Sequence, residues 1–362
     1  MRNPLADKVV DIKPSGIRKF FDIVSEMQDA ISLGVGEPDF DTPWHIRDEG
    51  IYSLEKGRTF YTSNAGLKDL RQEICNTIRR KQGVSYDWQH EVLVTVGGSE
   101  AIDIGLRAMC NPGDEVLIPQ PSYVSYVPCT ILADGNPVVI PLQQKNEFKL
   151  TAEELEAAIT PKTKMLVMPF PNNPTGSIMT KEDLEPIAEV VKRHDLYVLS
   201  DEIYSELTYK TEHVSISSLP GMKERTVLIN GFSKAYAMTG WRIGFIAAPE
   251  WIVKGCNKLQ GQYTSGPCSV SQKAAEAAYT LPQDCVEEMR KAFERRRNLI
   301  VELAKDIPGL EVNTPQGAFY LFPKCSSFYG KSDGKRTINN STDFAMYLLE
   351  VGHVATVAGD AF

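Results

Sequence analysis

The chain has 362 residues, of which 42% are hydrophobic and 24% charged, a balance typical of a globular protein with one large or two medium domains. Its 39 basic and 47 acidic residues give a formal net charge of −8, which argues against an electrostatic surface for nucleic acids. No apolar run approaches the roughly 20 residues that span a bilayer, and the N-terminus is polar, so we expect a cytoplasmic protein that does not enter a membrane.

The cysteines and histidines indicate neither a disulfide framework nor a metal site. Seven cysteines are scattered along the chain without a C-x-x-C pair, which predicts reduced thiols. The five histidines lack the spacing of metal ligands. We therefore expect structural roles for the histidines and no bound metal.

Short β-branched runs alternate with helical patterns through the middle of the chain. A strand-like run at 92–96 is followed by two glycines and a helical pattern at 99–109. A second helical pattern, at 180–194, begins with T-x-x-D, which is typical of a capped helix start. Runs that are apolar on both faces predict further strands at 115–119, 164–169, 196–200, 226–230 and 242–247. This alternation predicts an α/β fold with a mostly parallel central sheet flanked by helices.

The pattern changes from residue 284 onward. A long charged helix is predicted over 287–304, followed by a strand at 317–323, a helix at 342–351 and a short strand at 354–357. The first forty or so residues precede the first α/β unit, and we expect them to pack with this C-terminal part. The sequence therefore predicts a large α/β domain at 45–283 and a smaller α+β domain made of 1–44 plus 284–362.

One lysine stands out for its surroundings. Lys234 follows the predicted strand 226–230 within the run N-G-F-S-K-A-Y, and Arg242 lies eight positions later. A glycine, a serine and an aromatic residue crowd this lysine, which is a poor setting for a solvated cation. It is well placed to form a Schiff base with an aldehyde cofactor whose phosphate Arg242 binds. The pair therefore predicts amine chemistry with pyridoxal phosphate (PLP).

A carboxylate and a tyrosine follow another predicted strand. Asp201 ends the run L-Y-V-L-S-D, and ligands of open α/β sheets bind beyond the carboxyl ends of strands. A carboxylate there can keep the pyridine nitrogen of PLP protonated by charge pairing. Tyr204, three residues later, can share a helical face with Asp201 and donate to the phenolic oxygen. The alternative is a helix N-cap with an acidic first turn, which by itself fits S-D-E-I-Y better.

Three further segments supply weaker signals. Asn173, in F-P-N-N-P-T-G, offers an amide to the same phenolic oxygen, although a plain turn explains this run as well. Gly97 and Gly98 open a helix whose N-terminus suits an anion, or else form a tight β–α turn. Tyr123, in Q-P-S-Y-V-S-Y, can lay its ring against the pyridine, or simply lie in the core. None of these segments is specific alone, but together they supply each group that PLP requires.

Taken together, these segments resemble the fold-type I PLP-dependent aminotransferases, in the subgroup of aspartate and aromatic amino-acid aminotransferases. The resemblance covers essentially the whole chain. It rests on the runs LGVGEPDFDTP, VTVGGSEA, PSYVSY, PNNPTG, SDEIY, NGFSKAYAMTGWRIGF and GAFYLFP.

The resemblance implies a role for each candidate residue. Lys234 would bond the cofactor aldehyde, Asp201 would pair with the pyridine nitrogen, and Tyr123 would stack on the ring. Tyr204 and Asn173 would donate to the phenolic oxygen. The phosphate would be held by Gly98, Ser99, Glu100 through its backbone, Ser233 and Arg242.

The resemblance also implies substrate contacts and an assembly. Gly36 would lie near the substrate carboxylate, and Asn173 would contact substrate as well as cofactor. Tyr61 matches a tyrosine that reaches the phosphate of the partner subunit, so the active sites of a homodimer would be shared.

The sequence departs from the family at its C-terminal end. The family binds the substrate α-carboxylate with an arginine in an R-x-S-[YF]-A-T-like motif, and this sequence ends a few residues before that motif is expected. No other arginine matches the position. We therefore expect either an incomplete sequence or a truncated, impaired enzyme, because loss of such a clamp costs on the order of 2–5 kcal/mol.

The implied activity is transfer of an amino group from an L-amino acid, either aromatic, aspartate or a broad range, to a 2-oxo acid such as 2-oxoglutarate, with ping-pong kinetics. The alternatives are a PLP-dependent C–S β-lyase on the same fold and a non-catalytic PLP-binding regulator. Ser15, Ile17 and Arg18 lie in a segment that borders the pocket in relatives. The apolar Ile17 favours aromatic or mixed substrates, whereas Arg18 could meet a distal carboxylate.

Overall fold

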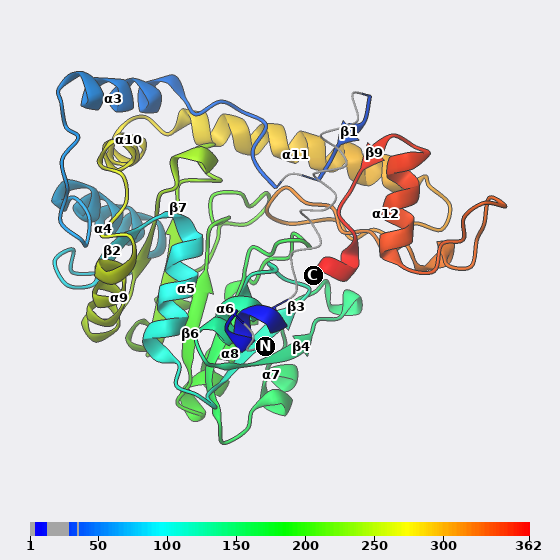
Figure 1. Cartoon of the computed structure of the whole chain (residues 1–362), viewed down its shortest axis with the longest axis horizontal. Coiled ribbons are helices and arrows are strands. Elements are labelled where there is room, and N and C mark those ends of the chain that lie inside the picture. Colours follow the sequence, from blue (N-terminus) through cyan, green and yellow to red (C-terminus); the bar gives the residue numbers. More distant parts are fainter. Residues whose placement is uncertain (1–3, 13–28, 35) are drawn as a thin grey trace.

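The computed structural model describes residues 4–12, 29–34 and 36–362. A seven-stranded sheet with the order β2-β8-β7-β6-β5-β3-β4 forms its centre (Figure 1). Strands β4, β3, β5, β6 and β7 pair in parallel, whereas β8 is antiparallel to both of its neighbours. The strands are β2 (Val92–Thr95), β3 (Glu115–Gln120), β4 (Asn136–Pro141), β5 (Thr163–Met168), β6 (Tyr197–Asp201), β7 (Thr226–Gly231) and β8 (Gly244–Ala247).

Helices cover both faces of this sheet, because alternate strand residues point to opposite sides. In β6, Leu199 packs in one core cluster with α5, α6 and α9, whereas Val198 packs in another with α7 and α8. A third cluster joins the β2 end of the sheet to α4 and α10. The helices are α3 (Trp44–Glu55), α4 (Lys68–Gln82), α5 (Gly97–Met109), α6 (Tyr126–Leu132), α7 (Ala152–Ala158), α8 (Lys181–Arg193), α9 (Glu250–Tyr263) and α10 (Ser269–Thr280).

The predicted mostly parallel sheet flanked by helices is confirmed. Helix α8 starts as expected, since Thr180 accepts a hydrogen bond from the Asp183 N–H and the Asp183 carboxylate accepts one from the Thr180 N–H, at 3.3 and 2.8 Å. Strand β4 escaped prediction. It begins with an Asn-Pro pair, ends in proline and lies at the sheet edge, where proline is tolerated and burial is incomplete.

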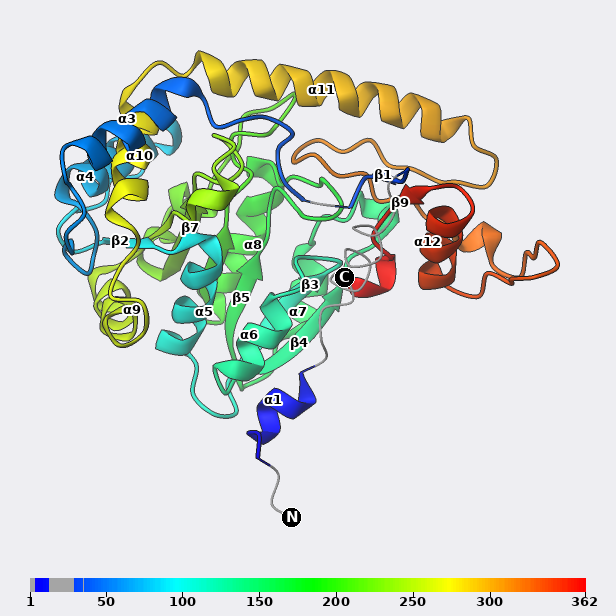
Figure 2. The same cartoon turned by 45° about the horizontal axis from the view of Figure 1, so that its top comes forward.

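The C-terminal part forms a separate layer of elements. Helix α11 (Asp284–Lys305) runs along one side of the molecule in both views (Figures 1 and 2), and α12 (Ser341–Glu350) lies near its far end. Strand β1 (Ile31–Ser32) pairs in parallel with β9 (Val354–Ala355), as expected if the N-terminal residues join this part. Helix α1 (Asp7–Asp11) instead contacts α6. The division into domains at 45–283 and 1–44 plus 284–362 therefore stays a prediction.

The strand predicted at 317–323 is absent from the described structure, which shows only isolated bridges from Thr208 to Gly317 and from Glu311 to Lys324. The backbone of this segment bonds to loops instead: the Ala318 N–H donates to the Leu207 carbonyl at 2.8 Å. Its consecutive aromatic residues pack around Tyr204 rather than alternating between two faces. An apolar run alone could not distinguish this loop from a buried strand.

No helix in the described ranges is long and apolar enough to span a lipid bilayer.

Candidate active site

Several of the predicted site residues meet at one edge of the sheet. Because β3, β5, β6 and β7 are parallel, their carboxyl ends lie at the same edge, and the segments that follow them come together. Tyr123 follows β3, Asn173 follows β5, and Asp201 is the last residue of β6. The loops after β3 and β5 are joined by a hydrogen bond from the Asn172 side chain to the Pro121 carbonyl at 3.3 Å.

Lys234 lies just beyond the end of β7, and its ammonium group points into the interior of this edge. The Nζ donates to the Gly36 carbonyl and lies 5.8 and 5.7 Å from the ring centres of Tyr204 and Phe319. Burial lowers the pKa of the Lys234 amine to about 8, and the nearby Glu37 opposes that shift. A sizeable fraction of the amine is therefore neutral near pH 7 to 8, which is the form that attacks an aldehyde.

Asp201 is a buried carboxyl group, with 7% of its surface exposed. The Tyr126 hydroxyl donates to its Oδ2 at 2.8 Å, and the Ile203 N–H donates to its Oδ1 at 3.2 Å. Burial nevertheless raises the pKa of Asp201 to about 6, because these two donors only partly compensate the desolvation. A carboxylate in this setting is stabilised by any cation that reaches it, which suits a protonated pyridine nitrogen.

The chain turns after Asp201 and does not form a helix. The Ser205 N–H donates to the Glu202 carbonyl and the Leu207 N–H to the Tyr204 carbonyl, at 2.9 and 2.8 Å. The expectation that Asp201 and Tyr204 share a helical face is therefore wrong, as is the alternative of a helix N-cap.

The reason is the burial of the Glu202 side chain. Its carboxylate accepts hydrogen bonds from Ser200 at 2.9 Å, Ser215 at 2.6 Å and Gln82 at 3.0 Å. These contacts keep the backbone extended through Asp201 and turn Tyr204 inward, where only 4% of its surface is exposed.

Arg242 lies against the first turn of α5. A Cβ added to Gly97 would be 2.7 Å from the Arg242 Nη2, and Gly97 has φ of +73°, so glycine is needed here both for space and for backbone conformation. A Cβ added to Gly244 would be 2.7 Å from the Gly97 carbonyl carbon. The guanidinium and the free N–H groups of the helix therefore face the same small space, which suits an anion such as phosphate.

The other residues predicted to hold the phosphate lie beside this space. Gly98, Ser99 and Glu100 form the first turn of α5, and Ser233 precedes Lys234 at a buried position. The Glu100 carboxylate accepts hydrogen bonds from the Val96 N–H and the Thr264 hydroxyl, at 2.5 and 2.6 Å. Its side chain is therefore engaged in capping the helix, and only its backbone could serve an anion.

Tyr123 is linked to Asp201 through a neighbour. Its ring lies edge-on to Tyr126, with centroids 5.7 Å apart, and Tyr126 in turn binds Asp201. Tyr123 is therefore separated from the buried carboxylate by Tyr126, and its ring can pack on an aromatic group bound near Asp201.

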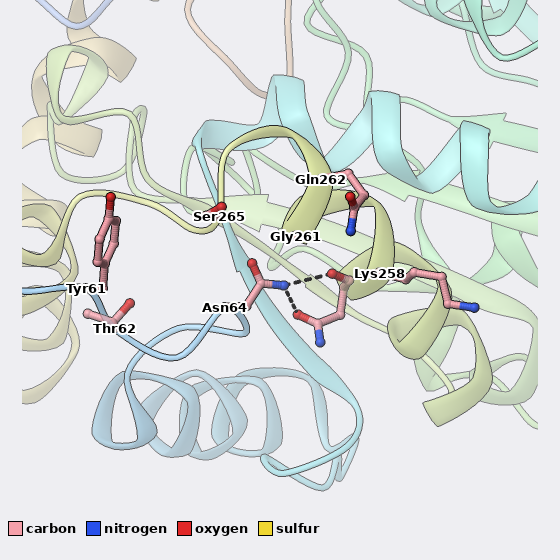
Figure 3. A pocket seen from close by; sticks show the side chains of 8 residues that line it. Tyr61, Thr62, Asn64, Lys258, Gly261, Gln262 and Ser265 are labelled. Atoms are coloured by element: carbon pink, nitrogen blue, oxygen red, sulfur yellow. Dashed lines mark hydrogen bonds between the residues drawn. The ribbon is translucent and has the colours of Figure 1, made fainter.

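Tyr61 lies on the surface and not among the other residues. It is 99% exposed and, with Thr62 and Asn64, lines a pocket of about 540 Å³ against helix α9 (Figure 3). The Asn64 side chain holds this wall by donating to the Asn257 side chain at 2.6 Å. Gly36 does lie at the site, because its carbonyl accepts from Lys234. Ser15, Ile17 and Arg18 lie outside the described residues.

Four residues of the site were not singled out from the sequence. Tyr126 binds Asp201, Tyr320 contacts the Tyr204 hydroxyl, and Phe319 flanks Lys234. Glu37 lies close enough to Lys234 to raise its pKa. The two aromatic runs P-S-Y-V-S-Y and G-A-F-Y-L-F-P carried a signal, since polar-tipped aromatic residues beside a predicted site often face it.

This set of groups fits PLP part by part. Lys234 offers an amine for the aldehyde, and Tyr204 offers a phenol to donate to the phenolic oxygen. Asp201 offers the pyridine nitrogen a buried carboxyl group whose desolvation is only partly offset by its hydrogen bonds. The close approach of Arg242 to Gly97 forms an anion cradle for the phosphate.

Comparisons with known proteins agree with this fit. The family described as aminotransferase class I and II matches residues 28–362. The chain is 43% identical to aromatic-amino-acid aminotransferase 2 of Thermococcus litoralis and 44% identical to an aspartate aminotransferase of Pyrococcus abyssi, over 99% of this chain and 90% of each relative. The crystal structure of an aspartate aminotransferase from Rhizobium meliloti superposes with a TM-score of 0.96 at 38% identity, covering 99% of this chain and 92% of that one. The chain therefore belongs to the class I and II aminotransferases, and it is a PLP-dependent enzyme that carries out transamination.

Proposed function

We propose that this aminotransferase takes the amino group from an aromatic L-amino acid or L-aspartate and passes it to 2-oxoglutarate. The relatives named for aromatic amino acids and for aspartate are similarly distant, at 43% and 44% identity, which supports both donor classes. The observation that carries the proposal is the partly buried Lys234 amine, with its lowered pKa, beside an anion cradle and a buried carboxyl group.

The roles proposed for the side chains follow from their positions. When bound, PLP supplies an electron sink that makes the Cα–H bond of an attached amino acid acidic. The Lys234 amine takes the proton from the substrate Cα, since its neutral form is populated near neutral pH. Asp201 keeps the pyridine nitrogen protonated, and Tyr204 and Asn173 donate to the phenolic oxygen.

The remaining roles concern binding. Arg242, Ser233 and the first turn of α5 hold the phosphate, and Tyr123 packs on the ring. Gly36 presents its backbone to the substrate carboxylate. The rings of Tyr204 and Phe319 lie beside Lys234 and reduce the contact of its amine with water.

A donor panel tests the activity directly. With 2-oxoglutarate as acceptor, we expect the purified enzyme to form glutamate from L-aspartate or from L-tyrosine and L-phenylalanine, and to form far less from L-lysine or L-alanine. Glutamate formation from none of the three expected donors would contradict the proposed substrates. Release of pyruvate and thiol from cystathionine, without glutamate, would favour a C–S lyase instead.

We also propose a homodimer with shared active sites. Tyr61 and its neighbour Phe60 are 99% and 82% exposed, and apolar side chains of α3, including Ile51 and Leu54, are exposed near them, which supports a covering subunit. In such a dimer Tyr61 would reach the phosphate of the partner subunit. Because a two-fold interface is reciprocal, each site would need residues from both chains.

Mixing two impaired variants tests the sharing. Lys234→Ala and Tyr61→Ala proteins should each be poorly active, whereas mixed dimers contain one site with both native residues. We expect subunit exchange to restore about a quarter of the wild-type activity, since half of the dimers are mixed and half of their sites are intact. A monomer in sedimentation equilibrium, or no rescue after proven exchange, would contradict this assembly.

A cytoplasmic location completes the proposal. It is supported by the seven cysteines, all of which are free thiols in the structure. The test is fractionation of the source cells followed by immunoblotting. Finding the protein outside the cytoplasmic fraction would refute a cytoplasmic location.

A further inference from the structure

Tyr320 lies where three segments of the site converge. Its hydroxyl is 2.5 Å from the hydroxyl of Tyr204, and the two rings meet edge-on with centroids 5.7 Å apart. The same hydroxyl stands over Gly36, where an added Cβ would lie only 2.7 Å from it. The carbonyl of Gly36 in turn accepts the hydrogen bond from Lys234. Tyr320 thus contacts Tyr204 and Gly36, both of which lie close to the Lys234 amine.

The loop that carries Tyr320 is fixed at several points. The Tyr209 hydroxyl donates to the Ala318 carbonyl, and the Ala318 N–H donates to the Leu207 carbonyl at 2.8 Å. The Gly317 N–H donates to the Gly176 carbonyl at 2.9 Å, which ties this loop to the one after β5. Tyr320 is therefore held against Tyr204 by the same turns that shape the site.

We propose that Tyr320 is a positioning residue for transamination, whose hydroxyl donates to Tyr204 and so directs the Tyr204 proton toward the cofactor. The inference rests on the proposed role of Tyr204 at the phenolic oxygen of PLP.

The argument is one of proton count. Two hydroxyl groups at hydrogen-bond distance share a single hydrogen bond, so only one of them donates to the other. If Tyr320 donates, the Tyr204 proton is free for the pocket that Lys234 enters. A phenol that accepts a hydrogen bond also becomes a stronger donor. If Tyr204 donated instead, its only proton would be directed away from the cofactor.

The same arrangement explains why residue 36 is a glycine. A side chain there would displace the Tyr320 hydroxyl, because contacts under 3.0 Å are not tolerated. Gly36 therefore serves two groups at once: its carbonyl receives Lys234, and its missing side chain makes room for Tyr320.

The test is the pH midpoint of the visible absorbance of the PLP-loaded enzyme, compared in Tyr204→Phe, Tyr320→Phe and the double variant. A hydrogen bond to the phenolic oxygen draws off negative charge that would otherwise hold the proton of the lysine-bound cofactor. Losing the donor should raise the midpoint in Tyr204→Phe. Tyr320→Phe should raise it by a smaller amount, about half a pH unit, and lower kcat roughly 3- to 10-fold with little change in KM.

The double variant shows whether Tyr320 changes the pH midpoint through Tyr204. If Tyr320 acts through Tyr204, its loss should not move the midpoint further once Tyr204 is Phe. Tyr209→Phe is the matched control, because it removes a hydroxyl that anchors the same loop through Ala318 but does not contact Tyr204. We expect it to lower the melting temperature and leave the midpoint unchanged.

Three results would overturn the proposal. A midpoint that falls or stays fixed in Tyr320→Phe, while Tyr204→Phe raises it, refutes the role of Tyr320 alone. A midpoint unchanged in Tyr204→Phe refutes the role of Tyr204 and the inference with it. An equal rise in Tyr209→Phe and Tyr320→Phe shows that general loosening of the loop, and not the hydroxyl pair, moves the midpoint.

Discussion

Replacement of Lys234 by alanine should remove nearly all activity, with kcat/KM lower on the order of 10⁴-fold or more. The side chain is expected both to bond the cofactor and to take the α-proton, and the described structure places its amine beside the rings of Tyr204 and Phe319. The measurement is the rate of glutamate formation together with the visible absorbance after adding PLP. The band formed by wild type should be missing from Lys234→Ala.

The control for this prediction is an exposed lysine outside the candidate site. Lys181 pairs with Glu185 on the exposed face of α8, where such ion pairs contribute little to stability. Lys181→Ala should match wild type in activity and absorbance. If Lys234→Ala forms the same absorbance band as wild type, the assignment of Lys234 is wrong.

Replacement of Asp201 by asparagine should separate catalysis from stability. If Asp201 pairs with the pyridine nitrogen as proposed, this variant removes the charged partner, and we expect kcat/KM to fall roughly 10²- to 10³-fold. The cofactor-free variant should nevertheless be more stable than cofactor-free wild type above pH 6, because it no longer buries an ionised group.

The sign of this stability change follows from the pKa of Asp201. Its folded pKa of about 6 exceeds the ordinary 3.8, so the folded protein holds this proton more tightly than the unfolded chain does. Wild-type stability therefore falls as pH rises from about 4 through 6, by about 3 kcal/mol for a shift of about two units. Urea unfolding of both cofactor-free proteins should show the advantage of Asp201→Asn in full at pH 8 and little of it near pH 4. Equal stability at pH 8 would show that Asp201 is not buried as the structure has it.

Tyr126→Phe serves as the intermediate case. It keeps the carboxylate but removes the hydroxyl that donates to Asp201 at 2.8 Å. Since that donor lowers the pKa of Asp201, its loss should raise that pKa, and we expect kcat/KM to fall about tenfold, which is less than in Asp201→Asn. A loss as large as in Asp201→Asn would mean that the hydroxyl, and not the charge, is the main contributor.

The sequence predicted those parts of the site that depend on strand ends. Lys234 and Asp201 follow or close apolar runs, and the parallel sheet brings such ends together without further information. It could not predict contacts made between distant segments. Tyr126 and Asp201 lie 75 residues apart, and Tyr204 and Tyr320 lie 116 apart, so neither pair leaves a local pattern.

The turn after Asp201 shows a second kind of limit. The run S-D-E-I-Y has the composition of a helix start, but the Glu202 side chain is bound by Ser200, Ser215 and Gln82. Tertiary contacts of this kind override local preference. The run 317–323 likewise has the composition of a strand, yet its backbone finds partners in neighbouring loops.

The antiparallel direction of β8 brings together the two residues that we propose hold opposite ends of the cofactor. Because β8 runs against β7, with Gly231 opposite Gly244, the residue that precedes β8 lies at the edge where β7 ends. Lys234 and Arg242 therefore belong to a single connection that leaves the sheet and returns to it. The length of this connection limits the spacing between the group proposed to bond the aldehyde and the group proposed to bind the phosphate. A residue inserted between 234 and 242 would disturb that spacing while leaving every strand in register, so we expect the fit to the cofactor to depend on the length of one loop.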